Sequence, residues 1–167
     1  MALPTGSGTE TLHAHHFEDV DNITTLIKGY QHHVYTVLSI IVHCRALDAT
    51  TDVFWIEVKG YNSHGGASGG YMRLVQQNIQ VNDTWVWNDK FSFNGFEPTG
   101  TPNSQTNSYT TGYQATIAAQ AGSTAQELIF DMTSSDDGGQ DYDIHVTYID
   151  QDSVSYTHLT VPTICSV

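Results

Sequence analysis

The segment 85–93 carries four aromatic side chains at positions that share one face of a β-strand. They are Trp85, Trp87, Phe91 and Phe93, and Asp89 lies between them. If exposed, these rings would form a stacking platform for sugars, whose apolar faces pack on aromatic rings. If buried, they would be one face of a hydrophobic core. We favour the core, because four exposed rings would be an unusual apolar patch for a soluble monomer. Carbohydrate binding or host recognition through Trp85 and Trp87 is the alternative.

Five of the nine histidines lie near the start of the chain. They are His13, His15, His16, His32 and His33. On a strand, His13 and His15 would point to the same face, which is a spacing that metal sites use. No carboxylate or cysteine joins them in a recognised motif, so neutral histidines on an edge strand are the simpler interpretation.

The segment 136–143 is an acidic turn with four carboxylates within eight residues: Asp136, Asp137, Asp141 and Asp143. Oxygen ligands on a tight glycine loop suit Ca²⁺, although this segment lacks the helix-loop-helix pattern. Exposed hairpin loops also select Asp and Gly, because both tolerate a positive φ angle. We therefore expect a solvated turn, and neither a metal nor another cofactor.

The sequence contains no phosphate-binding loop, H-E-x-x-H or G-x-G-x-x-G motif, and its one G-x-S-x-G spacing, Gly66 to Gly70, lies in a glycine-rich segment. Cys44 lies in an apolar run and is expected to be a buried thiol. Its neighbour His43 would point to the opposite face of a strand, so the two cannot form a catalytic pair. We expect no catalytic residues and no enzymatic activity.

The chain carries a formal net charge of −13, from 18 acidic and 5 basic residues. The basic residues all precede residue 91: Lys28, Arg45, Lys59, Arg73 and Lys90. Because phosphate backbones and anionic membranes are bound through Lys and Arg, a chain this acidic repels both. We therefore expect neither nucleic acid nor a membrane as a partner.

Runs of β-branched and aromatic residues, separated by Gly, Asn, Asp, Ser and Pro, predict about eight strands. The candidate segments are 11–17, 23–27, 34–43, 53–61, 71–81, 85–93, 113–119, 127–132 and 142–150. The almost continuously apolar 34–43 should be central and buried on both faces. Residues 62–70 and 95–111 are expected to be loops. In meander order, such strands predict an all-β, antiparallel, jelly-roll-like two-sheet β-sandwich, with a closed barrel as the alternative.

The last fifteen residues differ from the rest of the chain. Their sequence VSYTHLTVPT resembles the translation of a sequencing-library adapter. We therefore expect one β-sandwich domain over 1–152, with a short N-terminal arm, and a non-native tail over 153–167. An ordinary further strand is the alternative for this tail.

Several stretches resemble small virion structural proteins of tailed phages. They are LPTGSGTE near the start, VYTVLSIIVHC, WVWNDKFSF and the final DIHVTYIDQD. The resemblance spans most of 2–152, with little between 94 and 126. It implies a β-sandwich that is built into the virion as a capsid decoration or a tail-associated subunit. The implied partners are other virion proteins and further copies of the chain, which would be made in the host bacterial cytoplasm.

Overall fold

The computed structural model describes residues 10–48, 50–60, 70–96, 125–133 and 139–152. These residues form nine strands: β1 (Glu10–Val20), β2 (Thr24–Lys28), β3 (His33–Ala46), β4 (Asp52–Lys59), β5 (Tyr71–Ile79), β6 (Thr84–Trp87), β7 (Phe91–Asn94), β8 (Glu127–Met132) and β9 (Asp141–Asp152). The described parts contain no helix that is long and apolar enough to cross a bilayer. The all-β prediction is confirmed.

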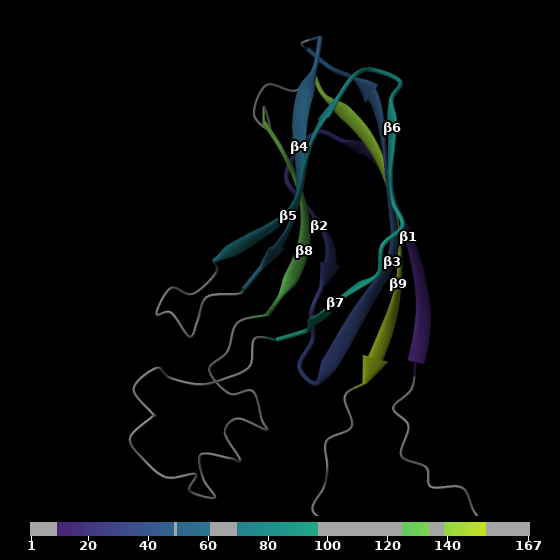
Figure 1. Cartoon of the computed structure of the whole chain (residues 1–167), viewed down its shortest axis with the longest axis vertical. Helices are drawn as coiled ribbons and strands as arrows, with labels where there is room; N and C mark the ends of the chain where they lie inside the picture. Colours follow the sequence, from purple (N-terminus) through teal and green to yellow (C-terminus); the bar gives the residue numbers. More distant parts are fainter. Residues whose placement is uncertain (1–9, 49, 61–69, 97–124, 134–138, 153–167) are drawn as a thin grey trace, which may run out of the picture.

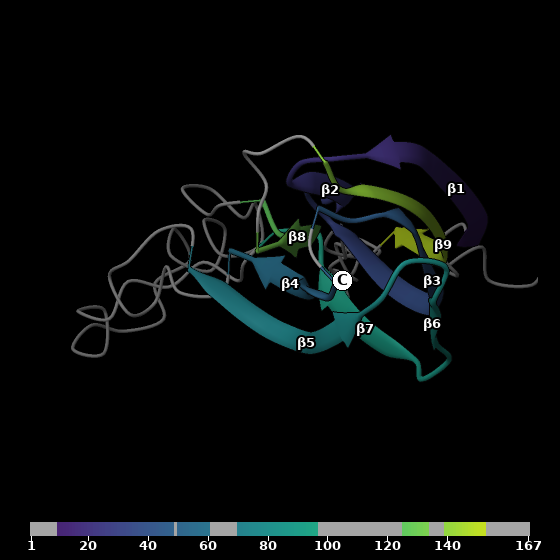
Figure 2. The same ribbon diagram turned by 90° about the horizontal axis from the view of Figure 1, so that it is seen from above.

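The strands form two antiparallel sheets that lie face to face (Figures 1 and 2). One has the order β1-β9-β3-β6, with β7 also paired to β3, and the other has the order β2-β8-β4-β5. If β6 and β7 are counted as one interrupted strand, this is the eight-strand arrangement of a jelly roll. The sandwich prediction is therefore confirmed, and the alternative of a closed barrel is wrong.

The predicted meander order is also wrong, because most consecutive strands switch sheets. Among the described strands, β4 and β5 are the consecutive pair that share a ladder. The turn at Asn82 and Asp83 instead carries the chain from one sheet to the other. There the Cys44 N–H donates to the Asp83 carbonyl at 3.0 Å, and the Asn82 N–H donates to the Cys44 carbonyl at 2.8 Å. The end of β3 thus fixes the turn that connects the two sheets. The turn residues alone do not predict this connection, because it depends on contacts with a distant strand.

β3 is the central strand of the five-stranded sheet, as predicted, and pairs with β9 on one side and with β6 and β7 on the other. A register shift between Val37 and Ser39 makes a bulge at Leu38. Its buried side chains are Tyr35 and Val37 before the bulge, and Ile40, Val42 and Cys44 after it. Odd-numbered residues of β3 therefore point inward before the bulge, and even-numbered residues point inward after it. The prediction of burial on both faces is wrong, since the other face is partly exposed.

The segment 85–93, predicted as one strand, divides into β6 and β7. β6 pairs with residues 40–43 of β3, and β7 pairs with residues 34–37. Residues 88–90 consequently lie opposite the bulge, where neither strand can follow the ladder. The bulge in β3 is the physical reason for the division.

The core lies between the sheets, and Phe54, Ile56 and Val58 point into it from β4 with the predicted alternation. Other predicted segments lie outside the described residues. They are the arm 1–9, most of the loops 62–70 and 95–111, the strand 113–119 and the tail 153–167.

Tyr35 is buried at one end of the core among several ionisable side chains. Its hydroxyl oxygen accepts a hydrogen bond from the Tyr30 N–H at 3.3 Å. The rings of His33 and Tyr148 lie about 6 Å from its own, at 6.1 and 5.9 Å between centroids. Burial, with a smaller contribution from the charge of Asp150, raises the pKa of Tyr35 to about 12. The folded chain therefore holds this phenolic proton more tightly than the unfolded chain does.

We expect Ile40→Ala to lower the free energy of unfolding by about 2–5 kcal/mol, because it opens a cavity in the fully buried centre of the sandwich. Leu38→Ala removes an equally large side chain at the partly exposed bulge and should cost less. Urea denaturation of both variants measures the difference. Equal losses of unfolding free energy would contradict the assignment of Ile40 to the inner face and of Leu38 to the partly exposed bulge.

We also expect Tyr35 to contribute to a loss of stability at alkaline pH. Below its ordinary pKa of 10.0 both states are protonated, and the contribution is fully present. As the pH rises toward 12, the unfolded chain loses the proton first, so the free energy of unfolding falls. In Tyr35→Phe this fall should be shallower, whereas in Tyr71→Phe, which changes an exposed ring, it should match the parent protein. Denaturation at a series of pH values tests this, and an unchanged slope in Tyr35→Phe would contradict it.

Candidate functional site

The four aromatic rings of segment 85–93 face the core. Trp85 pairs with Val42 and Trp87 with Ile40, both on the inner face of β3, and Phe91 and Phe93 keep this orientation across the gap. Trp85 also reaches Phe54 of the other sheet, at 5.4 Å between ring centroids. This confirms the interpretation as a core face. Phe93 is buried, whereas Trp85, Trp87 and Phe91 are partly buried against the core, which favours the core face over the alternative of an exposed platform of Trp85 and Trp87.

His13 and His15 lie on the same face of the edge strand β1, as predicted. Their ring centroids are 6.0 Å apart, and both rings contact Tyr148 of β9, His13 by stacking at 5.0 Å and His15 edge-on at 5.5 Å. His16 points the other way and lies 3.4 Å from Glu18. These contacts account for the histidines of β1 without a metal ion.

His33 is placed differently, at the start of β3. Its Nδ1 lies 2.7 Å from Asp150 and its Nε2 lies 3.2 Å from Asp152, both on β9. Because carboxylates only accept hydrogen bonds, the imidazole satisfies both of them when it is protonated on both nitrogens. His33 therefore adjoins the end of β9, away from the pair His13 and His15 that contacts Tyr148.

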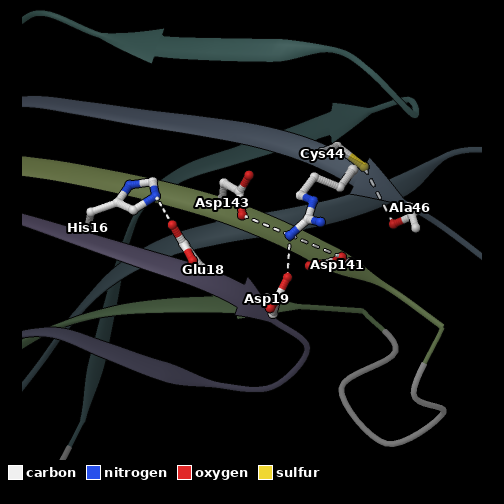
Figure 3. A network of polar contacts seen from close by, with 8 residues as sticks. His16, Glu18, Asp19, Cys44, Ala46, Asp141 and Asp143 are labelled. Atoms are coloured by element: carbon white, nitrogen blue, oxygen red, sulfur yellow. Dashed lines mark hydrogen bonds and ion pairs between the residues drawn. The ribbon is translucent and has the colours of Figure 1, made fainter.

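The acidic turn contributes Asp141 and Asp143 to a cluster with Asp19 of β1, and Asp136 and Asp137 lie outside the described residues. Candidate donor atoms of these three carboxylates lie within 4.8 Å of one another. The guanidinium of Arg45 occupies their centre: it contacts Asp19 and lies 3.5 Å from Asp143 and 3.7 Å from Asp141 (Figure 3). The three carboxylates raise the pKa of Arg45. A permanent cation from the chain itself therefore fills the place where Ca²⁺ would bind.

Cys44 is fully buried, as predicted, and burial raises its pKa to about 11. Its thiol donates to the Ala46 carbonyl at 3.7 Å. His43 faces the opposite side of β3, where its Nδ1 lies 2.9 Å from the Thr84 hydroxyl. The two neighbours do not form a pair, and the thiol is protonated at neutral pH.

The outer face of the five-stranded sheet is a surface with little charge, which we call the neutral face. Between Glu10 at one end and Glu18 and Asp143 at the other, the outward positions of the paired strands carry no Asp, Glu, Lys or Arg, and Asp89 and Lys90 lie at the edge, between β6 and β7. These outward positions are Leu12, Ala14, His16, Val34, Thr36, Ser39, Ile41, His43, Thr84, Val86, Ser92, Asn94, His145, Thr147, Ile149 and Gln151. Leu12 and Val86 are largely exposed there. A surface of this kind is unexpected on a chain with a net charge of −13.

The outer face of the four-stranded sheet differs, because it holds a shallow hollow of about 290 Å³ with charged walls. We call it the Tyr71 hollow. It is lined by Ile23, Glu57, Tyr71, Arg73, Ile129 and Asp131. β4, β5, β8 and the residue before β2 each contribute, so the hollow spans the sheet.

Arg73 is the most constrained polar group of the Tyr71 hollow. Its Nε donates to Glu57 at 2.9 Å and its Nη1 to Gln76 at 3.0 Å, while its guanidinium stacks on Trp55 at 4.5 Å from the ring centroid. The Glu57 side chain is only 8% exposed. The hollow thus combines an immobilised donor, a buried acceptor and the exposed ring of Tyr71.

Sequence analysis missed the Tyr71 hollow. The outward positions of β4 carry Trp55, Glu57 and Lys59, and those of β5 carry Tyr71 and Arg73. A row of aromatic and charged residues on the solvent-facing side of a strand can indicate a binding surface. It gains meaning only once β4 and β5 are known to be neighbours.

No protein-family model matches this chain, and no curated protein matches it. Two solved structures have distant structural similarity to it. One belongs to the disulfide-linked pili of Bacillus endospore appendages, with 7% identity over 92% of this chain and 98% of that chain, at a TM-score of 0.39. The other is the C-terminal family 22 carbohydrate-binding module of Clostridium thermocellum Xyn10B, with 10% identity over 92% of this chain and 90% of that chain, at a TM-score of 0.40. Neither likeness assigns a function to this chain.

Proposed function

We propose that this chain is a non-enzymatic structural protein of a tailed bacteriophage virion, made in the host bacterial cytoplasm and incorporated as a capsid decoration or a tail-associated subunit. Its partners are further copies of itself and other virion proteins. The buried, protonated thiol of Cys44, which forms no pair with its neighbour His43, supports a role without catalysis.

The neutral face is the observation that carries this proposal. Copies of a chain with a net charge of −13 repel one another, so a surface that brings few charges together favours their association. The row of Val86, Ile41, His145 and His16 crosses the face from edge to edge without a carboxylate. A second copy stacked on this face would bury exposed apolar side chains and leave the acidic groups in solvent.

The positions of the phage-like stretches also support the proposal. VYTVLSIIVHC lies in β3, WVWNDKFSF covers β6 and β7, and DIHVTYIDQD is most of β9. These strands are neighbours in the sheet that bears the neutral face. Jelly rolls recur among viral capsid proteins, and this analogy at the level of the fold also favours a structural role in a virion.

The oligomeric state tests the proposed assembly surface. We expect the parent protein to self-associate in sedimentation equilibrium, and Val86→Asp to be monomeric because it places a carboxylate among the apolar side chains at the β6 edge of the neutral face. Val86 is 47% exposed, so the variant should still fold, which circular dichroism would verify.

Val81→Asp is the matched control. Val81 is 41% exposed but lies in the turn after β5, outside the neutral face, and this variant should associate like the parent. A parent protein that stays monomeric at its highest soluble concentration, or equal dissociation of both variants, would contradict the proposed surface.

The virion assignment itself is checked by the genes that flank the coding sequence. We expect capsid, portal or tail genes on either side, because phage structural genes are needed together during assembly. A setting of sugar-degradation genes would overturn the assignment.

A further inference from the structure

We propose that the Tyr71 hollow binds a neutral saccharide. The inference goes beyond the structural role, because the hollow lies on the outer face of the four-stranded sheet and the neutral face lies on the other sheet. A subunit that associates through one face keeps the other available for a ligand.

The lining of the hollow matches the two chemical surfaces of a sugar. A pyranose presents an apolar C–H face and a rim of hydroxyls that both donate and accept hydrogen bonds. Tyr71 is 59% exposed, with Lys59 Nζ 5.8 Å from its ring centroid, and its ring can stack on the C–H face, while Ile129 adds an apolar side chain to the lining. Arg73 supplies donors, and the carboxylates of Glu57 and Asp131 supply acceptors.

The polar groups of the hollow are held in place before any ligand arrives. Glu57 and Gln76 fix the guanidinium of Arg73 over the Trp55 ring. Asp131 is held by its Oδ1, which accepts from the Met132 N–H at 2.8 Å. Fixed groups lose little conformational entropy on binding, so a shallow hollow of about 290 Å³ can still retain a small ligand.

The charges of the hollow select a neutral ligand. Two carboxylates face the guanidinium of Arg73 and the ammonium of Lys59, whose Nζ lies 5.8 Å from the Tyr71 ring centroid, so these charges balance and an acidic sugar or a phosphate gains no net attraction. A cationic ligand gains little, because the buried carboxylate of Glu57 is already paired with Arg73 at 2.9 Å. Hydroxyl groups can use the remaining donors and acceptors without breaking this pair.

An array of neutral and acidic oligosaccharides, followed by calorimetric titration of each retained glycan, tests the proposal on the full chain. We expect retention of neutral glycans only. Tyr71→Ala should weaken binding about tenfold or more, since it removes the stacking ring. Arg73→Lys keeps the charge but loses the planar fork of donors, and should also weaken it.

Tyr30→Ala is the matched control, because Tyr30 is similarly exposed at 63% but lies outside the hollow. It should bind glycans like the parent, and Tyr71→Ala should keep the parent's oligomeric state. The proposal is overturned if no neutral glycan is retained, if acidic glycans are retained instead, or if Tyr30→Ala and Tyr71→Ala lose affinity equally. None of these outcomes bears on self-association through the neutral face.

Discussion

The pairing of β3 with β9 is the interaction on which the rest of the structure depends. The ladder runs from His33 opposite Asp152 to Ala46 opposite Asp141. The outer strands of this sheet attach to the pair, β1 through β9 and β6 and β7 through β3. The same two strands supply much of one wall of the core, so ladder hydrogen bonds and apolar burial reinforce each other.

The strong acidity of the chain constrains where its charges can lie. Two carboxylates among the described residues are buried: Asp52 accepts a hydrogen bond at 2.9 Å from the hydroxyl of Tyr142 in the opposite sheet, and Glu57 accepts one at 2.9 Å from Arg73. Three more surround Arg45 at the end of the five-stranded sheet. Acidic groups are thus paired or placed at the margins, which leaves the middle of one outer face without formal charge.

The two outer faces of the sandwich are consequently suited to different tasks. The neutral face combines β-branched, small and polar side chains, which favours contact with another protein surface of low charge. The Tyr71 hollow lies on the other sheet and has fixed charges with an aromatic wall, which favours a small polar ligand. Such a division allows a structural subunit to present a binding surface without disturbing its own assembly.

The sequence alone determined the all-β class, the inward face of β4, the burial of Cys44 and the inward aromatic row of segment 85–93. Each of these follows from local alternation, which reports the side of a strand directly. Tertiary structure alone decided the strand order, because a short turn such as Asn82-Asp83 serves equally as a hairpin or as an arch between sheets. It also decided which residues of β3 face the core. A one-residue bulge at Leu38 moves the inward positions from odd-numbered to even-numbered residues, and the composition of the strand gives no sign of it. The Tyr71 hollow depended on tertiary structure for the same reason: Glu57, Arg73 and Asp131 are ordinary surface residues on three separate strands until the sheet places them side by side.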